Sequence, residues 1–334
     1  MKLRVGVIGL GSRWEDRYRG ALAALSERFE LRAVFDPVAL LADRHAQQGD
    51  IAINRGYQAL LAREDVDVVL VLSCGWLGPL PVLAACDRGK AIFAGGDLAW
   101  SPDDLLTVRD RVQRSGVAFL AEFPRRYAPA TIRLMELIAT RLGPPQLLFC
   151  HDQEREPAPP AERNGCQDAM PRSLVEAVDW CRYVVGNEPS SAVGVCHPGT
   201  NTPRHGSYRM LSLDFSQQAG TGQGPMAQIS YGSYIPSAWT EAASFHAPSQ
   251  LQVCCERGVA FLDLPSTLIW FDEAGRHIES LESERSPVEA LLMRLHRAVT
   301  SLVQVTSDLD DACRAHEIVR QACRSAHSGT RVSL

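Results

Sequence analysis

Two closely spaced glycines near the N-terminus have the pattern of a nucleotide-binding turn. Gly9-Leu10-Gly11 follows an apolar run, residues 3–8, and precedes a segment with helical spacing. Glycines at such a turn let the backbone approach a pyrophosphate at the start of the helix. Asp36 ends the next apolar run, where a carboxylate can bind ribose hydroxyls. The pair predicts an adenine dinucleotide and favours NAD over NADP, because Asp36 would repel a 2′-phosphate.

This nucleotide-binding pattern is incomplete, and its residues have other interpretations. Trp14 stands where the third glycine of the pattern is usual. It could cover a bound nucleotide, or it could be a wedge between helix and sheet. If it filled the space of the pyrophosphate, the nucleotide site would be lost. Asp36 could also be a turn residue at the end of a strand, directly before Pro37.

A second group of charged residues could carry out acid–base chemistry. Glu176 and Asp179 are three residues apart on a predicted helix, 173–185, so they share one face, and Arg172 lies one turn before Glu176. A carboxylate in a dry pocket can exchange a proton with a substrate, because burial raises its pKa. The alternative is a simple ion pair between Arg172 and Glu176.

The elements that must position these residues fall into two regions. Over the first 120 residues, strand patterns (3–8, 30–35, 66–73, 91–94, 117–121) alternate with helical patterns (17–28, 38–48, 57–63, 79–88, 102–115). This alternation predicts a parallel sheet built from βαβ units. Helices are expected over 129–142, 173–185, 288–303 and 309–326, and short strands over 190–282.

The expected fold is therefore of the α/β class and has two domains. Residues 1–123 would form a Rossmann domain with a doubly wound parallel sheet. Residues 124–334 would form an α+β domain with a large open, mostly antiparallel sheet.

Composition narrows the range of partners. The net charge is −5, which disfavours nucleic acid as a ligand. No apolar run approaches the roughly 18 residues of a membrane span, and the N-terminal run lacks a signal-peptide cleavage site. The ten cysteines show no CxxC spacing, which favours reduced thiols and a cytoplasmic protein. The histidines have no metal-ligand spacing, so no metal is expected.

The chain resembles the Gfo/Idh/MocA family, named for glucose-fructose oxidoreductase and inositol dehydrogenase. The resemblance rests on the glycine turn with Asp36, VDVVLVLS at 66–73, Gly89-Lys90, PRRYAPA at 124–130 and the closing segment DACRAHEIVRQACRSAHSGTRVSL. It implies an NAD(P)-dependent oxidoreductase that acts on a sugar, polyol or related carbonyl by hydride transfer. It also implies a homo-oligomer, a dimer or tetramer formed through the open sheet.

The resemblance includes departures from the family's catalytic residues. Family members carry Glu-Lys-Pro after the strand at 91–94, and these positions fall on Gly95, Gly96 and Asp97. The family signature Asp-x-x-x-His-x-x-Asp falls on Arg172, Glu176 and Asp179, which keeps only the last aspartate. A catalytically degenerate protein, which binds a nucleotide or sugar as a sensor or regulatory subunit, is therefore the alternative to an oxidoreductase with a non-standard site.

Three sets of candidate site residues follow. The catalytic candidates are Glu176, Asp179 and Asp97. The oxidoreductase interpretation expects Glu176 and Asp97 to converge near the C4 position of the nicotinamide. The binding interpretation expects both to point at solvent or to pair with arginines. The substrate-binding candidates are Arg126, Arg172 and His151, with an interdomain salt bridge as the alternative for Arg126. Glu122 is expected to pair with Arg125 or Arg126. The cofactor-binding candidates are Gly9, Gly11, Ser12, Arg13, Trp14, Asp36, Ser73, Cys74, Gly95 and Gly96.

Overall fold

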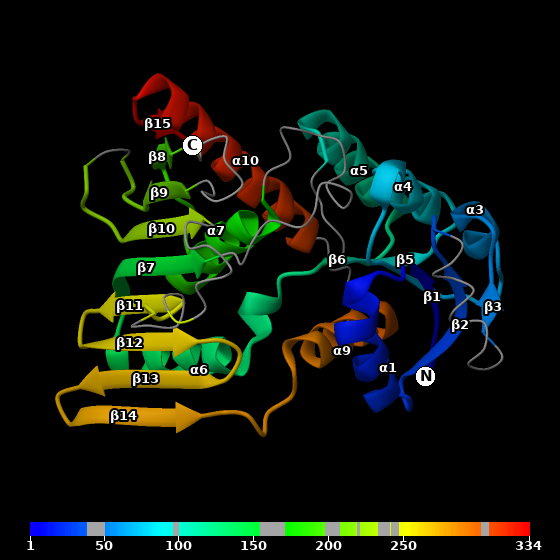
Figure 1. Cartoon of the computed structure of the whole chain (residues 1–334), viewed down its shortest axis with the longest axis horizontal. Helices are drawn as coiled ribbons and strands as arrows, with labels where there is room; N and C mark the ends of the chain where they lie inside the picture. Colours follow the sequence, from blue (N-terminus) through cyan, green and yellow to red (C-terminus); the bar gives the residue numbers. More distant parts are fainter. Residues whose placement is uncertain are drawn as a thin grey trace. The chain divides into compact units, whose positions relative to one another are not determined.

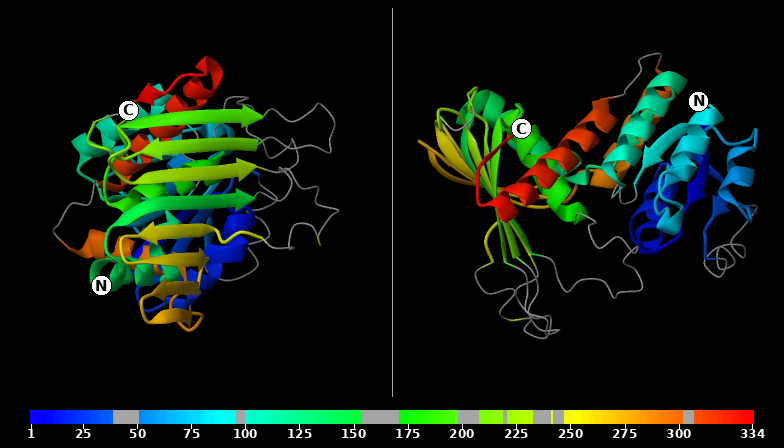
Figure 2. Two further views of the ribbon diagram at one scale, coloured as in Figure 1. Left: turned by 90° about the vertical axis from the view of Figure 1, so that its left-hand side faces the viewer. Right: turned by 90° about the horizontal axis from the view of Figure 1, so that it is seen from above.

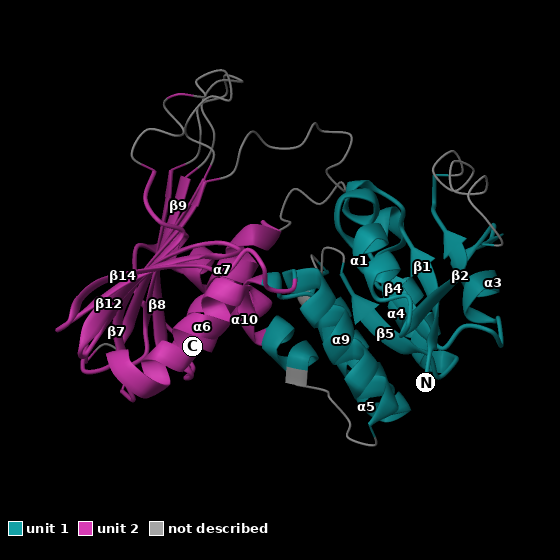
Figure 3. Cartoon of the chain, turned by 90° about the horizontal axis from the view of Figure 1, so that it is seen from below, with its two compact units in different colours: residues 1–124, 286–313 teal, residues 125–285, 314–334 magenta. Residues whose placement is uncertain are grey.

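The computed structural model (Figure 1) describes residues 1–38, 51–95, 100–153, 171–197, 208–218, 221–232, 241, 247–301 and 307–334. Gly96, Asp97 and nearly all of the helix predicted over 38–48 lie outside the described residues. The chain forms two compact units (Figure 3). Unit 1 contains Met1–Pro124 and Ser286–Cys313, and unit 2 contains Arg125–Arg285 and Arg314–Leu334.

Unit 1 is built on a six-stranded parallel sheet, as the alternating pattern predicts. The strand order is β3-β2-β1-β4-β5-β6. The order reverses direction between β1 and β4, and in doubly wound sheets ligands bind at such a point, outside the carboxyl ends of the strands. The strands are β1 Leu3–Ile8, β2 Phe29–Phe35, β3 Ala52–Ile53, β4 Val68–Val71, β5 Ala91–Ala94 and β6 Phe119–Ala121.

The helices of unit 1 follow the sequence pattern with one clear difference. The helix predicted over 17–28 instead starts with a π-helical turn, η1 (Trp14–Tyr18), and α1 (Arg19–Ala24) ends where the chain turns at Leu25 to enter β2. The α5 helix has the predicted bounds, Pro102–Ser115. Its N-terminus is capped by Ser101, which accepts a hydrogen bond from the Asp104 backbone N–H, and Gly116 ends it in the left-handed conformation. The other helices are α3 Tyr57–Leu61, η2 Gly75–Leu77, α4 Leu80–Asp87 and α9 Pro287–Thr300.

The C-terminal region does not belong to one domain alone. Unit 1 includes residues 286–313, which the sequence analysis placed in the second domain. The α10 helix (Ser307–Ser328) contributes Leu309 and Ala312 to the core of unit 1, and Ile318 and Val319 to the core of unit 2. A pattern of apolar residues shows which face of a helix is buried but not against which core it packs.

Unit 2 contains a nine-stranded, mostly antiparallel sheet with helices on one face (Figure 2). The order is β14-β13-β12-β11-β7-β10-β9-β8-β15, and among the strands that the structure describes only β7 and β10 pair in parallel. The helical elements are η3 Pro124–Tyr127, α6 Pro129–Leu137, η4 Ile138–Leu142, α7 Arg172–Val185 and the later part of α10. The strands are β7 Pro145–Gln153, β8 Ser191–His197, β9 Tyr208–Asp214, β10 Met226–Gly232, β11 Leu251–Cys255, β12 Gly258–Asp263, β13 Thr267–Asp272, β14 Gly275–Ser280 and β15 Val332–Ser333.

The described part of the chain contains no helix that is long and apolar enough to cross a membrane.

Candidate active site

Gly9 and Gly11 shape the turn after β1. Gly9 has a φ of +90°, and a Cβ atom built on it would lie 2.5 Å from the backbone nitrogen of Ser73. Only glycine fits there, because the turn both needs a positive φ and passes close to the end of β4. A Cβ atom on Gly11 would meet nothing within 4 Å among the described residues. The turn thus has the close packing and the open space that a dinucleotide pyrophosphate requires, so these residues fit that cofactor.

Asp36 lies at the end of β2, beside this turn. Its side chain is buried, and its Oδ2 atom accepts a 2.5 Å hydrogen bond from the Leu10 backbone N–H. Its Oδ1 atom accepts a 2.7 Å bond from the Val38 N–H. The carboxylate therefore has the turn role that we considered as an alternative. Each of its oxygens has a second lone pair that can accept a ribose hydroxyl.

Trp14 and Tyr18 are buried in unit 1 at the two ends of η1. Trp14 is 3% exposed and Tyr18 is fully buried, with its ring packed edge-to-face on Phe93 at 5.6 Å. A third glycine allows close packing of helix on strand, and here the wider π-helical turn accommodates two aromatic side chains instead. The burial of Trp14 is what the wedge interpretation predicts.

Gly95, directly after β5, is closely surrounded by side chains of unit 1. A Cβ atom on it would lie 2.8 Å from Leu72 Cδ2 and 3.1 Å from the Tyr18 hydroxyl. Its carbonyl oxygen accepts a 2.5 Å hydrogen bond from Arg13 Nη1, which lies 3.4 Å from Glu122 Oε2. The sequence analysis did not foresee this contact of Glu122 with Arg13.

The described cofactor-binding candidates thus gather at the carboxyl ends of the unit 1 strands. Ser73 follows β4 and donates its backbone N–H to Ile8, and Cys74 precedes η2. Ser12 is exposed at the start of the helical segment after β1.

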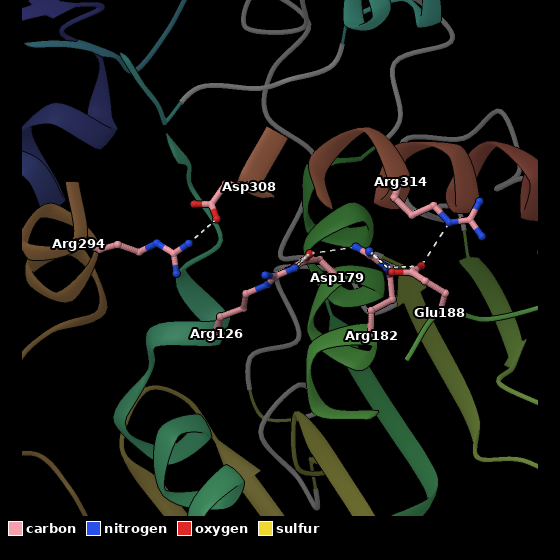
Figure 4. Close-up of polar contacts among 7 residues, drawn as sticks. All are labelled: Arg126, Asp179, Arg182, Glu188, Arg294, Asp308 and Arg314. Atoms are coloured by element: carbon pink, nitrogen blue, oxygen red, sulfur yellow. Dashed lines mark hydrogen bonds and ion pairs between the residues drawn. The ribbon is translucent and has the colours of Figure 1, made fainter. Parts of the chain in front are cut away.

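The second candidate cluster lies on α7 in unit 2 (Figure 4). Asp179 is 1% exposed, and its carboxylate accepts hydrogen bonds from Arg126 Nε (2.6 Å) and Arg126 Nη2. On its other side Arg182 Nη1 lies 3.5 Å from Oδ1, and Arg182 also binds Glu188. Asp179 therefore binds two guanidinium groups at once. This geometry suits a residue that positions its neighbours more than one that exchanges protons.

Glu176 also pairs with arginines. It forms an ion pair with Arg172 one turn before it on α7, so the alternative considered from the sequence is observed. Its Oε2 atom lies 3.7 Å from Arg125 Nε, and Arg125 donates a 2.5 Å hydrogen bond to Asp152 on β7. Glu176 thus pairs with arginines within unit 2, and Asp97 lies outside the described residues.

His151, next to Asp152 on β7, forms a hydrogen bond within the sheet. Its Nδ1 atom lies 2.8 Å from Ser230 Oγ, and the two residues are register partners on β7 and β10. Burial lowers the pKa of His151 below its usual value. The side chain is therefore neutral at neutral pH.

His316 on α10 is a buried residue of unit 2 that the sequence analysis did not single out. It is 9% exposed, and burial together with the positive charge of Arg172 lowers its pKa to about 4. It falls in the apolar repeat of the helix, with Ala312 and Val319. A histidine in such a repeat is the signal that could have identified it. Among the described residues, no group of three His, Cys, Asp or Glu side chains could hold a metal ion.

Comparison with known proteins identifies a matching family model and several similar sequences. Residues 3–123 match the family model described as an oxidoreductase family with a NAD-binding Rossmann fold, GFO_IDH_MocA. Inositol 2-dehydrogenase from Cereibacter sphaeroides is 31% identical over 215 residues, which cover 63% of this chain and 61% of that protein. D-xylose 1-dehydrogenase (NADP(+)) 2 from Haloferax volcanii is 33% identical over 121 residues, 36% of this chain and 35% of that protein. Both matches span less than two thirds of the relative.

Solved structures match the chain over its whole length. A putative dehydrogenase from Bordetella bronchiseptica has a TM-score of 0.81 at 16% identity, with 100% of both chains covered. Aldose-aldose oxidoreductase from Caulobacter crescentus has a TM-score of 0.80 at 15% identity, also with 100% of both chains covered. At such identities these structures share the fold. The family match covers the dinucleotide-binding unit: residues 3–123 form the NAD-binding Rossmann domain of the Gfo/Idh/MocA oxidoreductase family.

Proposed function

We propose that the protein is an oxidoreductase that transfers a hydride between NAD and a sugar, polyol or related carbonyl compound. The observation that carries the proposal is the turn after β1. Gly9 packs closely against Ser73, and a Cβ atom on Gly11 would meet nothing within 4 Å among the described residues. The Asp36 carboxylate accepts a hydrogen bond from Leu10 in the same turn. When bound, the nicotinamide ring would supply or accept the hydride. The inositol and xylose dehydrogenase relatives support a polyol or sugar as substrate.

Residues of the chain would bind the cofactor, exchange the proton and bind the substrate. Gly11 and Ser12 would bind the pyrophosphate, and Asp36 the adenosine ribose, which is why we propose NAD rather than NADP. Ser73, Cys74 and Gly95 would line the nicotinamide. Glu176 is the proton-exchange candidate that the described residues offer, and Arg126, Arg172 and His151 remain substrate-binding candidates in this proposal. Assembly as a homo-oligomer through the open sheet also remains part of it.

One observation favours a second function, binding without turnover. Both described carboxylates of the catalytic set, Glu176 and Asp179, pair with arginines. A carboxylate that must first leave an arginine is a poor proton carrier, so a sensor or regulatory protein on the same fold is the alternative.

The test is a fluorescence titration of the purified protein with NADH and with NADPH. NADH should bind with micromolar affinity and more tightly than NADPH. In Asp36→Asn the preference for NADH over NADPH should fall on the order of tenfold, because the variant removes a charge that repels the 2′-phosphate. Asp16→Asn removes the same charge from an exposed position on η1 and is the matched control.

Two outcomes would change the conclusion. If neither dinucleotide binds, the proposed oxidoreductase function is wrong. If NADH binds but no hydride transfer occurs with myo-inositol, xylose and a wider panel of polyols, the binding function is the better description.

A further inference from the structure

A partly buried ion pair, Arg13 with Glu122, lies at the carboxyl ends of β5 and β6. Arg13 comes from the turn after β1, and its Nη1 atom donates to the Gly95 carbonyl at 2.5 Å. The same atom lies 3.4 Å from Glu122 Oε2, and the Glu122 side chain is fully buried while 30% of the Arg13 side chain is exposed. Groups at the end of the sheet therefore bind the Arg13 guanidinium, while part of the Arg13 side chain remains exposed to solvent.

The two groups that bind Arg13 are fixed by the sheet. The Gly95 backbone N–H donates to Val71 at 2.9 Å, and the Glu122 N–H donates to Ala94 at 3.0 Å. A Cβ atom on Gly95 would lie 2.8 Å from Leu72 Cδ2, so the backbone of Gly95 packs closely on its neighbours. Arg13 thus has a rigid support, which pre-organises its charge.

The position of this pair in the strand order indicates which end of a dinucleotide it would meet. Asp36, which would bind the adenosine ribose, ends β2 on one side of β1. Gly95 and Glu122 follow β5 and β6 on the other side, beyond β4. Because a dinucleotide lies across the point where the strand order reverses, its two halves lie over opposite sides of β1. Arg13 therefore extends toward the half of the sheet that takes the nicotinamide.

We propose that Arg13, held by the Gly95 carbonyl and Glu122, is the fixed positive charge beside the nicotinamide, where it favours the neutral reduced ring over the cationic oxidised ring. The inference rests on the proposed function and adds to it a residue that sets the redox preference of the bound cofactor. Arginine does not release a proton near neutral pH. Its part is electrostatic, and the proton of the reaction must pass through another group.

The test compares the affinities of the purified protein for NAD⁺ and NADH, and it needs no substrate. Arg13→Gln should lower the ratio of the NAD⁺ and NADH dissociation constants on the order of tenfold, because a positive charge no longer opposes the oxidised ring. Glu122→Gln should raise the ratio, because a negative charge is lost. Arg17→Gln removes an exposed arginine from η1, the helical segment that follows Arg13, and should change the ratio by less than about twofold.

A charge-preserving variant separates the electrostatic role from a packing role. Arg13→Lys keeps the positive charge and should keep the wild-type ratio. The inference is overturned if Arg13→Gln and Arg17→Gln give the same ratio, or if Arg13→Lys behaves like Arg13→Gln. Those results would not contradict the proposed function, because both dinucleotides would still bind. Failure of the wild-type protein to bind either dinucleotide would refute the proposed function and this inference together.

Discussion

Replacement of Asp179 by asparagine tests whether this residue is a structural ion-pair partner. The asparagine side chain would keep the shape of the aspartate but not its charge, and its amide group would face guanidinium donors. Asp179 is 1% exposed, and the side chains of its partners Arg126 and Arg182 are 11% and 5% exposed. Water therefore cannot replace the lost carboxylate. Removing one member of a buried ion pair typically costs about 3–5 kcal/mol of unfolding free energy.

The assay is equilibrium unfolding in urea, followed by intrinsic tryptophan fluorescence, to which Trp180, buried on the same helix, contributes. The loss should appear as a lower midpoint with an unchanged slope. Glu136→Gln is the control in the same unit, because Glu136 is 56% exposed in its pair with Arg133 and should contribute less than about 1 kcal/mol.

The result that would refute this reasoning is a loss for Asp179→Asn as small as that for Glu136→Gln. A variant with wild-type stability but no hydride transfer would instead indicate that Asp179 acts in catalysis, as we first expected from the sequence.

Two further predictions concern unit 2. Because burial lowers the pKa of His316 from 6.5 to about 4, the unfolded state binds more protons between these values. The free energy of unfolding should therefore fall as the pH drops from about 6.5 to 4, by up to about 3 kcal/mol for this group. His316→Gln should remove that share of the pH dependence, as measured by urea unfolding. An unchanged pH dependence in the variant would contradict the assignment. A Cβ atom on Gly194 would lie 2.0 Å from the Ala322 carbonyl oxygen, so Gly194→Ala should separate β8 from α10 and lower the melting temperature. Gly20→Ala, where a Cβ atom meets nothing within 4 Å, should leave the melting temperature unchanged or raise it slightly.

Local patterns in the sequence were sufficient to predict most of the described elements and the nucleotide turn. The strand Ala91–Ala94 and the helix Pro102–Ser115 have the predicted bounds, because apolar spacing, Ser101 and Gly116 act within a few residues of each element. The parallel sheet followed from the alternation of strands and helices. The glycine turn and Asp36 could be identified because their spacing is tied to one βαβ unit.

Only the tertiary structure decided how the charged residues are paired and to which core the C-terminal helices belong. Arg13 meets Glu122 across 109 positions of the chain, and Arg126 meets Asp179 across 53. Local spacing did reveal the pair of Arg172 and Glu176, since both lie on one turn of α7. The distant pairs depend instead on which strand ends and helix faces the fold brings together. An arginine has the same local pattern whether it binds a substrate or a buried carboxylate, and only its surroundings in the folded protein distinguish the two.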